Sequence, residues 1–167
     1  MYTGNGKGKT TAAIGLGLRA VGHGKNVKML QFMKGPGNIY GETVALRRYV
    51  PQFEIEQVGR DGFVKRGKPA PEDMVAVRAG LEAAREALAG GYGLVILDEL
   101  NVAVDFGLVP IDEAVLLLRS RAPEVDVVIT GRYAPQELLD LADMVSEVRE
   151  IKHHFKSGVK ARPGIEY

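Results

Sequence analysis

A glycine- and lysine-rich stretch near the start of the chain carries the clearest chemistry. It reads Thr3-Gly4-Asn5-Gly6-Lys7-Gly8-Lys9-Thr10-Thr11 and leads into an apolar segment rich in glycine and alanine. Glycines let backbone N–H groups converge on phosphate oxygens, and the amino end of the following helix adds its positive dipole. Lys9 supplies a point charge and Thr10 a hydroxyl for Mg²⁺. The stretch predicts a phosphate-binding loop for a nucleoside triphosphate.

Two features of this loop depart from the general rule. The usual pattern has glycine where this chain has Thr3, and a flexible glycine-rich turn is the alternative interpretation. Interleaved glycines and lysines ahead of Thr-Thr are rare at average glycine usage, which favours the phosphate loop. Only Met1, Tyr2 and Thr3 precede the loop, fewer residues than a buried strand usually has. We therefore expect either a short first strand or a strand that begins outside this sequence.

Strands and helices alternate along the rest of the chain. Apolar runs predict strands over 26–32, 53–58, 94–97, 125–130 and 144–149, the second of them at a sheet edge. Apolar spacings of three and four predict helices over 11–22, 42–49, 71–89, 110–121 and 135–142, and the glycine- and proline-rich segment 59–71 is expected to be a mobile loop. This alternation predicts an α/β fold in which a parallel sheet carries helices on both faces, in one P-loop domain spanning residues 1–167.

The first predicted helix contains two internal glycines. Ile14, Leu18 and Val21 lie on one side of it and are the residues expected to face the core. Gly15 and Gly17 each cost about 1 kcal/mol relative to alanine within a helix. We therefore expect close packing against a sheet to compensate for both glycines.

Composition narrows the classes of function. The net charge is +1 with acids and bases mixed along the chain, so no broad surface for nucleic acid or an anionic membrane is predicted. The chain has no cysteine, which excludes disulfides and thiolate chemistry and fits a reducing cytoplasm. No apolar run has membrane-spanning length, and no secretory pattern is recognised. We expect a cytoplasmic protein without nucleic-acid or membrane partners.

An acidic pair follows the most apolar of the predicted strands. Asp98 comes directly after Leu-Val-Ile-Leu, so its carboxylate is expected at the carboxyl edge of a central strand, where ligands bind in open α/β sheets. An acid there binds Mg²⁺ shared with a triphosphate, while Glu99 orients a water or a neighbouring group. A solvated strand end is the alternative for an isolated acid. The expected Mg²⁺ ligands are Thr10 and Asp98.

Other polar residues leave more than one interpretation open. Arg132 follows the strand that ends in Thr130-Gly131, and it either clamps a phosphate or carboxylate or lies on the surface. The basic run 65–68 either grips an acidic ligand or forms a solvated loop. His153-His154 lack the partner spacing of a zinc site and are expected to be hydrated surface histidines. No nucleophile with a base and an orienting group is visible, so an enzyme of this sequence would use a nucleophile other than a protein side chain.

Motifs along the whole chain resemble those of the P-loop ATP:corrinoid adenosyltransferases. They are TGNGKGKTTAA, QFMKG, the GF of the central loop, VILDELN, VVITGR and KHHFKSGVKARPGIEY, so the resemblance runs from Thr3 to Tyr167. The family's loop has the same T-G-N-G-K-G-K-T-T form, which accounts for Thr3. The resemblance implies a P-loop NTPase-like, RecA-like fold. It also implies transfer of the 5′-deoxyadenosyl group of ATP to the Co(I) of a corrinoid, in adenosylcobalamin biosynthesis or salvage.

The resemblance further implies residue roles, substrates and partners. Lys9, Asp98 and Glu99 are the implied catalytic residues. ATP and its triphosphate are expected to contact Gly4, Asn5, Gly6, Lys7, Gly8, Lys9, Thr10, Thr11, Asn101 and Arg132. Phe63 and Lys65 are expected to contact the corrinoid, although the family's G-F-T-W pattern here has Val64 and Lys65 in its last two places. Mg²⁺ is the implied cofactor, ATP and cob(I)alamin or a cobyrinic acid derivative the substrates, a flavoprotein or flavodoxin the reductant, and a homodimer the assembly.

Two rival functions stay open at this point. In a phosphoryl-transfer enzyme or ATPase, Glu99 would activate water or a substrate and the γ-phosphate would be cleaved, giving ADP, whereas adenosyl transfer releases triphosphate. An ATP-gated corrinoid carrier would bind the corrinoid without forming a cobalt–carbon bond. The chain ends in an apolar, acidic and aromatic sequence, so we also expect Ile165 and Tyr167 to dock on the body or on a partner subunit.

Overall fold

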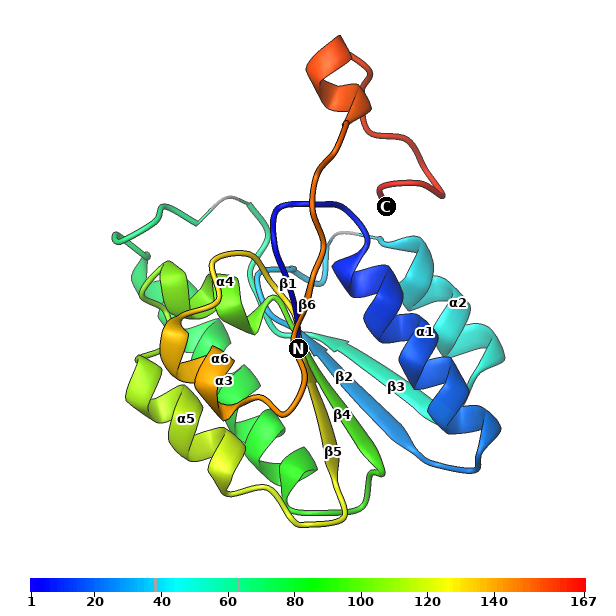
Figure 1. Ribbon diagram of the computed structural model, residues 1–167, viewed down its shortest axis with the longest axis vertical. Helices are drawn as coiled ribbons and strands as arrows, with labels where there is room; N and C mark the ends of the chain where they lie inside the picture. The colour runs from blue at the N-terminus through cyan, green and yellow to red at the C-terminus, as the bar shows by residue number, and fades with distance from the viewer. Residues whose placement is uncertain (38, 63) are drawn as a thin grey trace.

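Parallel strands form the centre of the molecule (Figure 1). The computed structural model describes residues 1–37, 39–62 and 64–167. Its larger sheet has the order β3-β2-β4-β5, and the strands are β2 (Val27–Gln31), β3 (Phe53–Gln57), β4 (Leu94–Asp98) and β5 (Asp126–Ile129). A second parallel pair, β1 (Tyr2–Thr3) and β6 (Ser146–Glu147), adjoins β5 through a bridge between Tyr2 and Thr130. The parallel sheet and the edge position of β3 confirm the sequence prediction.

Helices cover both faces of the sheet, as the sequence predicted. The helices α1 (Lys9–Gly22) and α2 (Gly41–Tyr49) lie on one face, and α3 (Pro71–Leu88), α4 (Leu100–Asp105), α5 (Ile111–Arg119) and α6 (Gln136–Leu141) lie on the other (Figure 1). The short helix α4 was not predicted. The strand predicted over 144–149 is much shorter, because its only ladder partner among the described residues is the two-residue strand β1.

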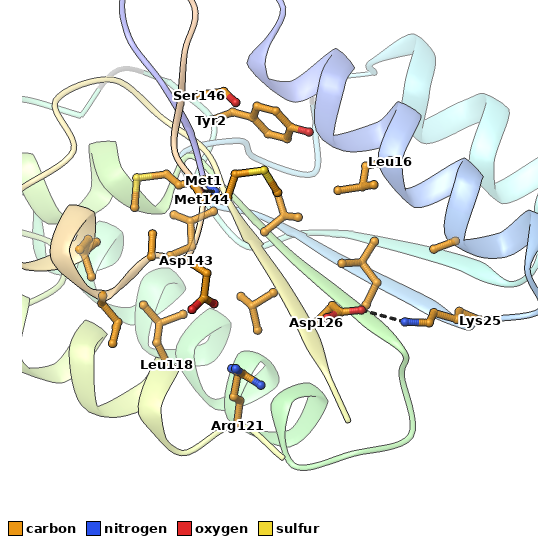
Figure 2. A pocket seen from close by; sticks show the side chains of 18 of the residues that line it. Met1, Tyr2, Leu16, Lys25, Leu118, Arg121, Asp126, Asp143, Met144 and Ser146 are labelled. Atoms are coloured by element: carbon orange, nitrogen blue, oxygen red, sulfur yellow. Dashed lines mark hydrogen bonds and ion pairs between the residues drawn. The ribbon is translucent and has the colours of Figure 1, made fainter. Parts of the chain in front are cut away.

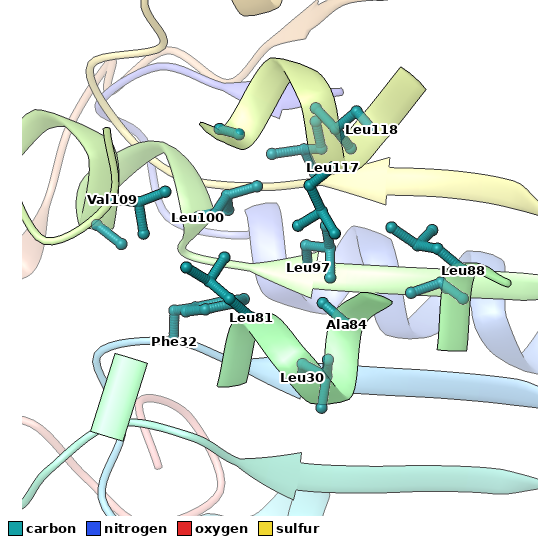
Figure 3. Close-up of a cluster of buried hydrophobic side chains, with 14 of the residues drawn as sticks. Leu30, Phe32, Leu81, Ala84, Leu88, Leu97, Leu100, Val109, Leu117 and Leu118 are labelled. Carbon is teal, nitrogen blue, oxygen red and sulfur yellow. The ribbon is translucent and has the colours of Figure 1, made fainter. Parts of the chain in front are cut away.

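Each face of the sheet has its own apolar cluster. Val77, Leu81, Ala84 and Leu88 of α3 are buried against the central strands, which confirms the helical spacing read from the sequence. Leu30, Leu97 and Leu117 belong to the same cluster (Figure 3). The opposite cluster contains Met29, Ile55 and Ile96. Near-continuous burial along β2 and β4 is what a strand covered on both faces requires.

The face that α1 turns to the sheet matches the prediction in part. Ile14 and Val21 pack against the apolar cluster, but Leu18 is 45% exposed, and Ala13 and Gly17 are the buried residues. A β-carbon at Gly17 would lie 2.3 Å from Cε1 of Phe53, so small residues are needed where this helix approaches β3. At Gly15 an added β-carbon would meet no atom within 4 Å. Close packing therefore compensates for the glycine at 17, and the same expectation was wrong at 15.

The carboxyl ends of the strands lie at one edge of the sheet because the strands are parallel. The segment after β6 runs upward past the loop at residues 4–8 and continues into a short 3₁₀ helix, His154–Ser157, which stands away from the body (Figure 1). Ile165 and Tyr167 are 51% and 45% exposed on this monomer. Across the described parts of the chain, none of the helices has both the length and the apolar character needed to cross a membrane.

Candidate nucleotide site

The predicted phosphate loop joins β1 to the amino end of α1. Gly8 has a φ of 118°, a left-handed conformation that suits glycine, and Ala12 N–H donates to Gly8 O at 2.8 Å to open the helix. Lys9 is only 6% exposed, and its Nζ donates to Gly6 O at 2.8 Å. Burial lowers the pKa of Lys9. The helix terminus and the inward-folded ammonium group thus face the same small region.

Two glycines of the loop serve a purpose that the sequence did not reveal. Gly6 N–H donates to Val148 O at 2.7 Å. A β-carbon at Gly4 would lie 2.5 Å from Val148 O, and one at Gly6 would lie 2.8 Å from the carbonyl carbon of Arg149. These two glycines therefore allow the segment after β6 to pass directly against the loop. Gly8, whose added β-carbon would meet nothing within 4 Å, remains open for a ligand.

Asp98 is the centre of the hydrogen-bonding network at the strand ends. It is fully buried, and its Oδ1 accepts hydrogen bonds from the hydroxyl of Thr10 at 2.9 Å and of Thr130 at 2.6 Å. Its Oδ2 accepts from Gln31 Nε2 at 3.2 Å and lies 3.3 Å from Lys34 Nζ. The structure thus brings together Thr10 and Asp98, the two residues predicted to hold Mg²⁺.

Three polar residues of this network were not assigned a role from the sequence. Lys34 Nζ lies 3.1 Å from Glu42 Oε1 as well as near Asp98, and Gln31 Nε2 donates to the same Glu42 oxygen at 3.3 Å. Burial by itself would lower the pKa of Lys34, but the carboxylates of Asp98 and Glu42 raise it. Burial would likewise raise the pKa of Glu42, but Lys34 lowers it. One sequence feature could have indicated this network: polar Gln31 ends an apolar strand and is followed closely by Lys34.

Glu99 occupies the tight turn between β4 and α4. Its φ of 61° is unusual for a residue other than glycine, and its N–H donates to Thr130 Oγ1 at 3.0 Å. Burial, followed by the negative charge of Asp98, raises the pKa of Glu99, while nearby cations including Lys9 act in the opposite direction. Backbone strain and a perturbed acid in one turn are typical of functional sites.

The loop after β5 is tied to both the phosphate loop and α4. Thr3 Oγ1 donates to Gly131 O at 2.9 Å, and Asn101 Nδ2 donates to the same oxygen at 3.2 Å. This contact gives Thr3 a structural use at the position where the usual pattern has glycine. Gly131 has a φ of 132°, and a β-carbon there would lie 2.8 Å from Cβ of Asn101. Asn101 is fully buried and holds the loop that presents the exposed Arg132.

Several predicted contacts lie outside this centre. Asn5, Lys7 and Thr11 are exposed around the loop. Lys65 is exposed in the segment after β3, which has no helix or strand among the residues described between 59 and 70 and is anchored by the ion pairs Arg60–Asp73 and Arg66–Asp105. Phe63 lies outside the described residues, so its predicted contact is not located.

The two histidines of the tail have local roles. His153 Nδ1 accepts a hydrogen bond from Phe155 N–H at 3.1 Å, and His154 Nε2 lies 3.3 Å from Glu166. Over residues 1–37, 39–62 and 64–167, no three His, Cys, Asp or Glu side chains gather as a metal cluster. The oxygen pair of Thr10 and Asp98 instead matches the few hard oxygen ligands by which Mg²⁺ is usually held beside substrate phosphates.

A phosphate loop at the amino end of α1, a buried strand-end aspartate and an all-parallel sheet define a P-loop nucleotide-binding α/β protein. Comparison with known proteins identifies the family within this class. The family model for ATP:corrinoid adenosyltransferase BtuR/CobO/CobP matches residues 1–167. The chain belongs to that family.

Individual relatives agree with the family match. The chain is 43% identical over 168 residues to the corrinoid adenosyltransferase CobA of Salmonella typhimurium, covering all of this chain and 84% of that protein. It is 36% identical to a corrinoid adenosyltransferase of Pseudomonas aeruginosa, over all of this chain and 82% of the relative. A Sinorhizobium corrinoid adenosyltransferase is 32% identical, over 99% of this chain and 78% of the relative.

Proposed function

We propose that this chain transfers the 5′-deoxyadenosyl group of ATP to the Co(I) of a corrinoid substrate, and that one domain spanning residues 1–167 carries this activity. The observation that carries the proposal is the convergence of Lys9, Thr10 and Asp98 at the amino end of α1. This arrangement suits a highly charged leaving group. Membership of the corrinoid adenosyltransferase family supports the corrinoid as the nucleophile, so no nucleophilic protein side chain is required.

The reaction balances with the groups that the substrates bring. The electron pair of Co(I) forms the cobalt–carbon bond to ribose C5′, the bond from C5′ to the triphosphate oxygen breaks, and cobalt ends as Co(III). The oxygen keeps the electron pair of the broken bond, so the negative charge on the leaving triphosphate rises. Preorganised positive groups that meet this charge lower the barrier. Lys9, the amino end of α1 with its positive dipole, and Arg132 are the groups proposed to supply them.

Thr10 and Asp98 are the residues that would hold Mg²⁺. When bound, the ion would neutralise part of the triphosphate charge. Lys34 contacts Oδ2 of Asp98, whereas Thr10 contacts Oδ1, and Glu42 would remain a partner for Lys34 if a cation shared the Asp98 carboxylate. Glu99, whose pKa burial raises, completes the wall of the site and is proposed to orient the metal's water or the ribose.

Corrinoid contact is proposed for Phe63 and Lys65, in the segment between β3 and α3. Val64 and Lys65 replace the last two residues of the family's loop pattern, which favours a substrate that needs less displacement of a lower axial ligand, such as an early-pathway cobyrinic acid derivative. Phe63→Ala should then slow reaction from Co(II) with a mild reductant far more than reaction from preformed Co(I). Equal losses in both assays would contradict a role for Phe63 in axial-ligand displacement.

Assembly, reductant and location are further parts of the proposal. We propose a cytoplasmic homodimer that receives its electron from a flavoprotein or flavodoxin. Ile151, Phe155, Ile165 and Tyr167 are exposed by 45% or more on the protruding tail, which supports docking of this tail on a second copy. Deleting Gly164–Tyr167 should reduce dimerisation in sedimentation velocity. An unchanged dimer would contradict docking by these residues.

The test of the proposed function is an anaerobic assay with Mg·ATP and chemically reduced cobalamin or cobyrinic acid diamide. The expected result is the absorbance change of cobalt alkylation together with stoichiometric inorganic triphosphate. ADP and phosphate as the nucleotide products would instead establish the phosphoryl-transfer rival. Saturable corrinoid binding without alkylation would establish the carrier. Arg85 is an exposed residue of α3, so Arg85→Ala removes a positive charge away from the site and is a matched control for Lys9→Ala.

A further inference from the structure

The segment between β3 and α3 is attached to other parts of the chain near both of its ends. Near its start, Gly59 N–H donates to Lys34 O at 2.9 Å, on the turn whose side chain reaches the nucleotide site. Near its far end, Gly67 N–H donates to Phe106 O at 3.1 Å, just past the end of α4. The residues proposed to contact the corrinoid lie between these two attachments. We therefore call residues 59–70 the corrinoid segment.

Arg66 makes the side-chain contacts at the far attachment. Its Nη2 pairs with Asp105 Oδ1, and its guanidinium carbon lies 5.2 Å from the centre of the Tyr133 ring. A guanidinium group suits both contacts, because it donates to a carboxylate and also stacks on an aromatic face. The sequence left open whether the basic run 65–68 grips an acidic ligand or is solvated. For Arg66, the acid is a carboxylate of its own chain.

Asp105 is the more buried partner of this ion pair. Its side chain is 13% exposed, whereas that of Arg66 is 62% exposed. Oδ2 of Asp105 is buried and accepts no hydrogen bond from the residues that the structure describes. A carboxylate largely removed from water is costly unless a cation meets it. The position of Asp105 therefore holds Arg66, and with it the corrinoid segment, against the end of α4.

The two partners of Arg66 belong to elements that carry groups of the nucleotide site. Asp105 is the last residue of α4, and this helix begins directly after Glu99. Tyr133 directly follows Arg132, the residue proposed to meet the triphosphate charge, and its φ of 57° marks a tight turn there. One guanidinium group thus joins the corrinoid segment to both of these elements.

We propose that Arg66 is a positioning residue for the corrinoid: through Asp105 and Tyr133 it fixes the corrinoid segment against α4 and against the loop of Arg132. This inference rests on the proposed function, in which Co(I) must reach ribose C5′, and it assigns Arg66 no contact with either substrate. Small errors in the placement of reacting groups lower rates steeply. Loosening the segment should therefore impair productive corrinoid binding and leave ATP binding as it is.

The test measures adenosylation by Arg66→Ala, Asp105→Ala and the double variant, with reduced cobalamin and with reduced cobyrinic acid a,c-diamide. Each single variant should lower kcat/KM for both corrinoids by about five- to tenfold, which fits one exposed ion pair and one ring contact. The double variant should be little worse than either, because both changes remove the same interaction. Arg66→Lys keeps the charge without the planar group and should lie between. KM for ATP should stay within about twofold of the wild-type value.

A second measurement reads the attachment itself without any corrinoid. Hydrogen exchange at the Gly67 amide should be about fivefold or more faster in Arg66→Ala, while the Phe106 amide, whose hydrogen bond closes α4, should change little. Lys25→Ala is the matched control for a lost cation. Its ion pair with Asp126, at 2.8 Å, also joins distant segments, but it lies at the start of β5 (Figure 2). This control should leave both readings unchanged.

Three results would overturn the proposal. The first is a wild-type kcat/KM for the corrinoids in Arg66→Ala. The second is a loss confined to the diamide, which carries carboxylates where cobalamin carries amides, with Asp105→Ala unaffected or improved. That pattern would show that Arg66 grips the substrate itself. The third is an equal fall in kcat/KM for ATP together with a lower melting temperature, which would limit Arg66 to support of the fold.

Failure of the proposed function would be seen separately, in the wild-type protein. If that protein forms no cobalt–carbon bond, the same variants are compared by calorimetric titration with cob(II)alamin in the presence of ATP. Arg66→Ala should then raise Kd by about five- to tenfold, and an unchanged Kd would overturn the proposal. A wild-type protein that binds no corrinoid would overturn both the proposed function and this role of Arg66.

Discussion

Asp98 combines a proposed role in catalysis with a structural one, and replacing it should reveal both. Its carboxylate is fully buried and receives two hydroxyl hydrogen bonds, an amide hydrogen bond and the Lys34 ammonium group. Asp98→Ala leaves these donors without their acceptor. Breaking a buried ion pair costs about 3–5 kcal/mol. Because Lys34 keeps Glu42 at 3.1 Å, we expect the lower end, about 3 kcal/mol.

That loss corresponds to a fall in melting temperature of about 6–12 °C for a protein of this size. Asp98 ends a strand, but its burial and its partners indicate that the fold does not tolerate its loss without cost. Adenosylation should also fall by about 10²–10³-fold if the carboxylate helps to neutralise the leaving triphosphate. Melting is measured by calorimetry, and activity by triphosphate release under anaerobic conditions.

Asp98→Asn separates the two effects. Its amide oxygen can still accept from Thr10 and Thr130. Gln31 Oε1 has no hydrogen-bond partner among the residues that the structure describes, so rotation of the Gln31 amide would give the new amide nitrogen an acceptor. We expect less than half of the alanine variant's melting loss but a similar loss of activity. Asp126→Asn, whose side chain is 71% exposed, is the control and should change melting little.

Two results would refute this reasoning. If Asp98→Ala has the same melting temperature as the wild-type protein, the buried network does not stabilise the fold as its geometry indicates. If Asp98→Asn turns over at the wild-type rate at saturating Mg·ATP, the charge of Asp98 does not act on the triphosphate.

Three further predictions follow from particular residues. Lys9→Ala should lower adenosylation by about 10²–10³-fold with near-normal melting, and near-normal turnover would contradict the triphosphate site. Gly17→Ala should destabilise by about 1–3 kcal/mol in denaturant titration because of the Phe53 ring, whereas Gly15→Ala should stabilise by about 0.5–1 kcal/mol; the reverse order would contradict the packing of α1. Asp73 accepts a hydrogen bond from Ala70 N–H and pairs with Arg60; burial opposes these contacts, but together they lower its pKa. The contribution of the ionised Asp73 to stability is complete above the pKa of Asp73 in the unfolded state, and it is lost as pH falls toward its pKa in the folded state. The difference in unfolding free energy between the wild-type protein and Asp73→Ala, about 2 kcal/mol at pH 7, should therefore narrow below about pH 4. A difference that does not depend on pH would contradict stabilisation by the ionised Asp73 carboxylate.

The family resemblance and the phosphate loop could be recognised from the sequence because both depend on residues that are consecutive or closely spaced. Lys9 and Thr10 follow the glycines directly, and Asp98 directly follows an apolar strand. Alternation of apolar periods also predicted the parallel sheet and its helical layers. Such patterns report local conformation, and in a parallel α/β fold the strand ends necessarily share one edge.

Tertiary structure decided which residues meet at that edge and which faces are buried. Gln31, Lys34 and Glu42 join Asp98 only because β2 pairs with β4 in a register that sets Gln31 beside Asp98. Gly17 faces the sheet in place of Leu18 because Phe53 of β3 fills the space. Contacts between distant segments follow from strand order and packing volume, which no local spacing in the sequence records.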